Sequence, residues 1–117
     1  MTSYKDVDRA VEILFDTAAI STSGDNDIIA APGAGKRIVL SSIIVQNESS
    51  TATTALLKDG ASTTFHRLLM QNQGDGLAFT FARGREWRLT ENTKFVVNLS
   101  GANSVGVSIG YFVEEIA

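Results

Sequence analysis

The stretch of residues 105–113, near the end of the chain, constrains the fold more than any other. Large apolar side chains occupy its odd-numbered positions, whereas Gly106, Ser108 and Gly110 stand at even-numbered positions between them. Because successive side chains of a β-strand point to opposite faces, this alternation predicts a strand with one apolar face and one face of nearly bare backbone. A face with so few side chains suits close contact with another segment or another subunit.

Short segments of the same kind recur along the chain, separated by clusters of Gly, Ser, Asn and Asp, which favour turns. They predict nine strands, at residues 11–17, 27–31, 37–46, 53–58, 63–70, 77–82, 87–89, 95–99 and 105–114. Nine short strands in 117 residues predict an all-β protein, a single-domain, jelly-roll-like β-sandwich. We expect residues 1–16 to form an N-terminal arm or an edge strand, and residues 17–117 to form the β-sandwich domain.

Two further segments bear on what covers the sheets. Leu77, Phe79 and Phe81 alternate with small residues, so they are expected to share one face of a strand. Residues 38–45 carry apolar side chains at both odd and even positions, which predicts a central strand with both faces covered. A two-layer sandwich covers only one face of each sheet, so the second cover has to come from the N-terminal arm, a neighbouring subunit, or both.

Asp59 and Gly60 predict the sharpest turn of the chain. A two-residue Asp-Gly loop accepts the positive φ angles that a tight β-hairpin requires. The segments 53–58 and 63–70 are therefore expected to form a hairpin.

Composition excludes several classes of protein. The chain contains no cysteine, which excludes disulfides, thiolate metal sites and a cysteine nucleophile. A net charge of −3 without a basic stripe argues against nucleic acid as a partner. No apolar run is long enough to span a membrane, and residues 1–9 lack the apolar core of a secretory signal peptide.

Residue types that carry out chemistry are sparse. His66 is the single histidine, and we interpret it as a strand or interface residue. Asp25 and Asp27, with Asp75, are candidate calcium ligands, but their spacing matches no known loop and a turn-capping role is the alternative. A glycosidase would need two carboxylates facing each other across a cleft, and no pair stands out. We therefore expect no catalytic residues, no metal site and no cofactor, and we do not expect an enzyme.

The segment 83–88 is the densest candidate for an interface. It brings Arg83, Arg85 and Arg88 together with Trp87, the only tryptophan. Arg and Trp often carry binding energy through stacking, paired hydrogen bonds and large buried area. The alternative is a surface turn followed by a core tryptophan, with arginines that extend into water. Three residues of the N-terminal arm complete the candidate interface, namely Tyr4, Val7 and Val11.

Four motifs make the chain similar to a group of small virion structural proteins of tailed bacteriophages and prophages. The resemblance runs from about residue 17 to residue 114 and rests on the motifs at 22–31, 35–40, 57–60 and 107–111. It implies a jelly-roll or related β-sandwich that decorates or cements a capsid surface as a homotrimer, or that forms part of a fibre or spike. The group has no catalytic residues to carry over.

From residues and resemblance together we expect a virion structural protein, in particular a capsid decoration or cement protein that stabilises the capsid surface as a homo-oligomer. The expected partners are further copies of the chain and the major capsid protein or another virion protein, in a virion assembled in the host cytoplasm. Neither nucleic acid nor a membrane is an expected partner. The alternative is a tail fibre, spike or carbohydrate-binding module, in which Trp87 and Tyr111 would stack on sugar rings.

Overall fold

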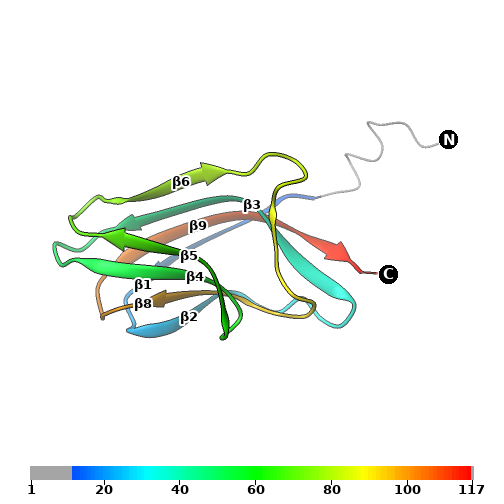
Figure 1. The fold of residues 1–117 in the computed structure, drawn as a ribbon, viewed down its shortest axis with the longest axis horizontal. Coiled ribbons are helices and arrows are strands. Elements are labelled where there is room, and N and C mark those ends of the chain that lie inside the picture. The colour runs from blue at the N-terminus through cyan, green and yellow to red at the C-terminus, as the bar shows by residue number, and fades with distance from the viewer. Residues whose placement is uncertain (1–11, 117) are drawn as a thin grey trace.

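Two antiparallel β-sheets packed face to face make up the protein (Figure 1). The structure is a computed structural model and describes residues 12–116. Sheet A contains, in order, β1 (Leu14–Ile20), β9 (Val105–Glu115), β3 (Lys36–Asn47) and β6 (Gly76–Thr80), and the short β7 (Trp87–Arg88) also pairs with β3. Sheet B contains, in order, β2 (Gly24–Ile29), β8 (Phe95–Leu99), β4 (Thr53–Asp59) and β5 (Thr63–Met70).

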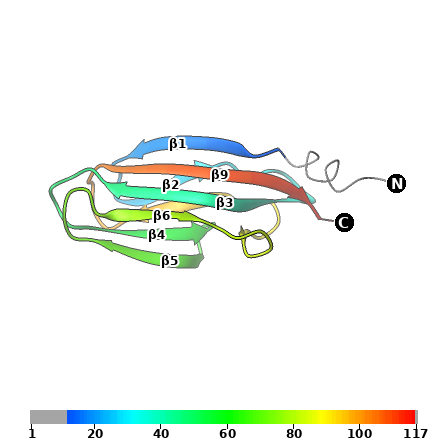
Figure 2. The same cartoon turned by 90° about the horizontal axis from the view of Figure 1, so that it is seen from above.

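The order of the strands is that of a jelly roll. The chain crosses from one sheet to the other at each connection between strands, except in the β4–β5 hairpin and the β6–β7 link. The short β7 pairs with β3 beyond the end of β6 and so continues the same edge of sheet A. The other eight strands form two four-stranded sheets, as in double-sheet jelly rolls. Figure 2 shows β1, β9, β3 and β6 of sheet A as one row. The prediction of an all-β sandwich is confirmed.

All nine predicted segments form strands. The strands β5 and β8 begin and end at the predicted residues, and the bounds of the others differ by up to three residues. The predicted boundary between arm and sandwich, after residue 16, falls inside β1, which is an edge strand of sheet A. Residues 1–11 of the predicted arm lie outside the described residues.

The β4–β5 hairpin is present, but its loop is longer than predicted. Asp59 pairs with Thr63, which leaves residues 60–62 in the loop, with Gly60 at a φ of 67°. Asp59 stays in β4, where its carboxylate accepts hydrogen bonds from the backbone N–H and the hydroxyl of Thr90. The prediction of a two-residue loop is therefore wrong.

A β-bulge explains the apolar residues at both odd and even positions of β3. The pairing of β3 with β9 shifts between Leu40 and Ser42. Before the shift, Ile38 and Leu40 belong to the buried core, and after it Ile43 and Val45 do. A bulge adds one residue to a strand, so it exchanges the faces to which odd and even positions point. The strand is central, as predicted, and these two apolar sets share one inward face. On the outward face Val39 is fully buried whereas Ile44 is 52% exposed, so the second face of β3 is covered only in part.

One polar side chain is fully buried at the end of β3. The side-chain amide of Asn47 donates hydrogen bonds to the backbone carbonyls of Thr51 and Asn72, at 3.1 and 3.2 Å. Its Oδ1 atom accepts a hydrogen bond from the N–H of Ser49 at 3.1 Å. Asn47 therefore ties the loop after β3 to the loop between β5 and β6.

Candidate interaction surfaces

The outer face of sheet A is made of small and uncharged side chains over most of its width. The inward positions of β9 and β3 lie in the core, so the alternate positions of the paired strands point outward. We call this surface the small-residue face, and its residues are Thr17, Ala19, Ser42, Ile44, Gly76, Ala78, Gly106 and Ser108. None of these side chains is ionisable, but the carboxylate of Glu48, just after β3, lies beside Gly106 and is the one ionisable group of residues 12–116 that lines the two grooves of this face.

Ile44 forms a ridge on the small-residue face. Its side chain is 52% exposed, although it lies on the central strand of the sheet. A groove of about 240 Å³ lies on one side of it, over Gly106 and Ser108, and a groove of about 280 Å³ lies on the other side, beside Gly76 and Ala78. The face is therefore a ridge between two grooves of small side chains and backbone.

The bare strip predicted for β9 is shorter than its sequence indicates. Gly106 and Ser108 are half-buried and border the groove, whereas Gly110 is buried. A Cβ atom added at Gly110 would come within 3.0 Å of the ring of Phe15 in β1 and would collide with the hydroxyl of Ser42. Phe15 and Ser42 thus cover the backbone at Gly110, while Gly106 and Ser108 stay accessible.

The outer face of sheet B is ionic by contrast. Across three neighbouring strands, the carboxylate of Asp25 accepts hydrogen bonds from Lys58, at 3.1 Å, and from Asn98, at 2.7 Å. The carboxylate of Asp27 lies 2.9 Å from the ammonium group of Lys94. Of the three aspartates considered for calcium, Asp25 and Asp27 therefore pair with lysines, and Asp75 accepts hydrogen bonds from the backbone N–H groups of Gln71 and Asn72. Within residues 12–116, no three acidic or histidine side chains come close enough to hold a metal ion.

Asp25 gives the fold a testable pH dependence. Its hydrogen bonds with Asn98 and Lys58 lower the pKa of its carboxyl from the usual value of about 3.9. The unfolded chain therefore binds more protons at this site, so the stabilisation is present above about pH 4 and is lost as the pH falls through the folded-state pKa. We expect the thermal midpoint of Asp25→Asn to fall less than that of the wild type between about pH 5 and about pH 3, as measured by circular dichroism. Equal falls would contradict this role.

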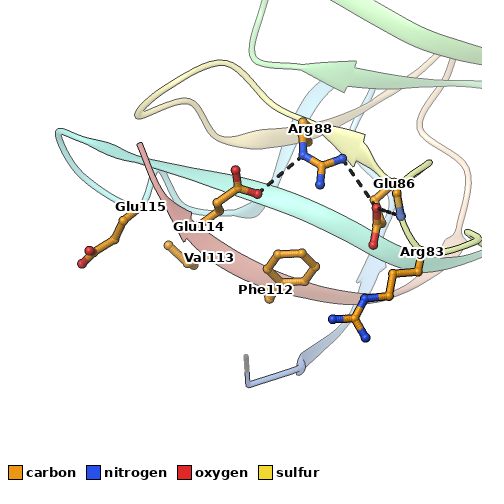
Figure 3. A pocket seen from close by; sticks show the side chains of 8 residues that line it. Arg83, Glu86, Arg88, Phe112, Val113, Glu114 and Glu115 are labelled. Atoms are coloured by element: carbon orange, nitrogen blue, oxygen red, sulfur yellow. Dashed lines mark hydrogen bonds and ion pairs between the residues drawn. The ribbon is translucent and has the colours of Figure 1, made fainter. Parts of the chain in front are cut away.

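A charged groove of about 650 Å³ lies on sheet A beside β7 and the last residues of β9 (Figure 3). Arg88 of β7 stands between two carboxylates, with its Nε 3.5 Å from Glu114 and its Nη1 3.5 Å from Glu86. Glu114 also pairs with Arg37 at 2.6 Å. The pKa of the Glu86 carboxyl is lowered, chiefly by a hydrogen bond from its own backbone N–H. The backbone N–H of Gly84 and the guanidinium group of Arg88 lower it further. The ionic groups of this groove therefore largely satisfy one another.

The predicted 83–88 patch is divided between two surfaces. Arg83 and Arg88 line the charged groove, together with residues 112–115 of β9. Trp87 points to the opposite side of β7 and packs against the core. Arg85 is exposed in the preceding turn, where its N–H donates to the carbonyl of Ala82. Alternate residues of a strand point to opposite faces, so Trp87 and Arg88 cannot act on one partner surface. The other predicted interface residues, Tyr4, Val7 and Val11, lie outside the described residues.

An aromatic cluster that sequence reasoning missed fills the edge of the sandwich between β5 and β6. The ring of Trp87 stacks on Phe65, with ring centres 4.9 Å apart, and Phe81 packs against Trp87 at the same separation. A small apolar pocket of about 160 Å³ opens beside it, lined by Ile43, His66, Leu77, Phe79, Phe81 and Trp87. The shared face of Leu77, Phe79 and Phe81 was predictable from their alternation, but the approach of β5 to β6 was not.

The two aromatic residues considered for carbohydrate binding are engaged inside the sandwich. One face of Trp87 is covered by Phe65, and Tyr111 packs against the core. The hydroxyl of Tyr111 donates to the carboxylate of Asp16 at 3.3 Å, and burial, followed by the charge of Asp16, raises its pKa. The two rings do not form an exposed platform for a sugar.

Comparisons with known proteins bear on the fold. No protein-family model matches the chain, and no curated protein matches it at a significant level. A solved structure described as "Bacillus endospore appendages form a novel family of disulfide-linked pili" is similar, with a TM-score of 0.50 and 15% sequence identity over 92% of this chain and 91% of that chain. At this identity the likeness concerns the fold alone. Together with the strand order it defines the chain as an all-β, two-sheet sandwich domain.

The part of the chain from residue 12 to residue 116 contains no helix that is long and apolar enough to cross a membrane.

Proposed function

We propose that the protein is a non-enzymatic structural subunit that assembles with copies of itself. The unequal outer faces of the two sheets carry this proposal. Sheets that face water usually have polar outer residues, as sheet B has in its lysine–aspartate pairs. The small-residue face exposes Ile44 and has Glu48 as the one ionisable side chain, in the described part of the chain, that lines its grooves, and depletion of charge is typical of the centre of a protein interface.

The fold supports the same function. A jelly-roll sandwich is a preformed scaffold, so a subunit of this kind loses little conformational freedom when it docks at many equivalent positions. The similar solved structure comes from work on disulfide-linked pili. This chain has no cysteine, so its own assembly would rest on non-covalent contacts.

The more specific form of the proposal is a virion protein that decorates or cements a capsid as a homotrimer and contacts the major capsid protein. The resemblance of the motifs at 22–31, 35–40, 57–60 and 107–111 to small virion proteins supports this form. A rigid domain with one face of few charges also suits attachment at repeated positions of a lattice.

Mass measurements over a wide concentration range test self-assembly. We expect the average mass in light scattering or sedimentation to rise above that of one chain as the protein is concentrated. A mass of three chains would support the homotrimer, and co-sedimentation with a capsid would support the virion role. A single-chain mass at every concentration, with no binding to a capsid, would contradict both.

A further inference from the structure

We propose that the small-residue face is a docking surface for a second copy of the same chain, with the two faces packed around a two-fold axis. This inference rests on the self-assembly in the proposed function and not on its trimeric form, because a contact around a two-fold axis joins copies in pairs. It concerns the surface on sheet A and uses neither the charged groove nor residues 1–11.

The shape of the face is complementary to itself. The Ile44 ridge lies directly beside the groove over Gly106 and Ser108. A two-fold axis that runs between two such faces places the Ile44 ridge of each copy opposite the groove of the other, so that one contact is made twice. A Cβ atom added at Gly106 would contact the carboxylate of Glu48 at 3.5 Å, so Glu48 borders this groove at Gly106.

Charge also favours a second copy on this face. Two copies with a net charge of −3 repel each other, and the repulsion is smallest where the surfaces carry the fewest charges. Among the described residues, Glu48 is the one ionisable side chain that lines the two grooves of the small-residue face. Docking through sheet B would desolvate its aspartate and lysine side chains, which is costly. Docking through the charged groove would disturb the pairs that Arg88 makes with Glu86 and Glu114. Docking through the small-residue face breaks no ion pair between the described residues that line its grooves, and of these it brings the carboxylate of Glu48 alone close to the partner.

The size of the face sets the strength of the contact. Four strands about 4.8 Å apart and about six residues long at 3.3 Å per residue cover about 400 Å² on each copy. The total of about 800 Å² lies below the range of stable interfaces, which begins at about 1,200 Å². We therefore expect a weak pair in isolation, which becomes effective when many copies are held together in one assembly.

Disulfide cross-linking tests the contact without interference from native cysteines, because the chain has none. An Ile44→Cys variant is mixed with a Ser108→Cys variant under oxidising conditions, and disulfide-linked pairs are quantified by mass spectrometry. We expect the 44–108 link to form at least about tenfold faster than the link between Ser108→Cys and Leu69→Cys. Leu69 is the matched control because it is 64% exposed and lies on the outer face of sheet B.

A charge substitution gives an independent readout. Ile44→Glu should weaken association at least about tenfold, because its carboxylate would lose its hydration in the groove of the partner, which the carboxylate of Glu48 also lines. Leu69→Glu should leave association unchanged. Both side chains are largely exposed, so both variants should keep the thermal midpoint of the wild type, which confirms that they fold.

The outcomes separate this inference from the proposed function. If the wild type assembles, but Ile44→Glu assembles equally well and the 44–108 link is no faster than the control, the docking surface is wrong while self-assembly stands. Trimers in which the 44–108 link is no faster than the control would contradict the docking surface in the same way. If the wild type stays a single chain at every concentration, both proposals fail.

Discussion

Replacing Phe95 by alanine should cost about 3–5 kcal/mol of folding free energy, the largest single effect we expect in this chain. Phe95 lies on β8, in the middle of sheet B, and its side chain is fully buried in the core cluster. Truncation removes the burial of the ring and leaves a cavity that the neighbouring strands fill only in part. A domain of this size has a total stability of about 5–15 kcal/mol, so the variant should be close to unfolding at room temperature.

Urea unfolding of Phe95→Ala and Phe79→Ala measures this effect against a matched control. Phe79 is also a strand residue, but it is 49% exposed at the β6 edge, so its truncation should cost much less. Comparable losses of folding free energy in the two variants would contradict the role of Phe95 as a central residue of the core.

Replacing Asn47 by alanine should cost about 2–4 kcal/mol, because each buried polar group left without a partner costs about 1–3 kcal/mol. The variant removes the two hydrogen bonds to the carbonyls of Thr51 and Asn72 and the one from the N–H of Ser49. Asn47→Asp should be nearly as harmful, since a carboxylate can accept from Ser49 but cannot donate to the two carbonyls.

Gln46→Ala is the control for Asn47, since its side chain is exposed and makes only a 3.4 Å contact with the carbonyl of Gly74. Hydrogen exchange adds a local readout. The N–H of Gly74 bonds to the carbonyl of Asn47 at 2.7 Å, and it should lose protection in Asn47→Ala before the strands unfold. Unchanged protection together with a loss under about 1 kcal/mol would contradict the role of Asn47.

Side-chain alternation was sufficient to predict the strands. Each strand has one inward face, and the alternating large apolar residues of 105–113 and 77–81 point to it in the structure. The bulge at Ser41 was not predictable, because it depends on how β3 pairs with β9, and pairing between distant segments leaves little trace in one sequence. The expectation that both faces of β3 are covered holds at Val39, before the bulge, and fails at Ile44, after it.

The candidate surfaces were predicted only in part. The accessible backbone at Gly106 and Ser108 follows from the sequence, but the cover over Gly110 depends on the pairing of β1 with β9, which brings Phe15 opposite it. The prediction of 83–88 as one patch conflicts with the prediction of 87–89 as a strand, whose neighbouring residues point to opposite faces. The exposure of Ile44 was not predictable, because it depends on the faces exchanged by the bulge.

Methyl NMR with a soluble paramagnetic agent tests most directly whether the small-residue face is an interface between copies. The agent broadens signals of side chains that it can reach, so it reports which exposed methyl groups are covered when copies associate. We predict that the Ile44 methyl signals are broadened in dilute protein and become protected as the protein is concentrated, while the Leu69 signals stay broadened throughout. If Ile44 remains as accessible as Leu69 in samples whose mass shows that copies have assembled, the small-residue face is not the contact between them.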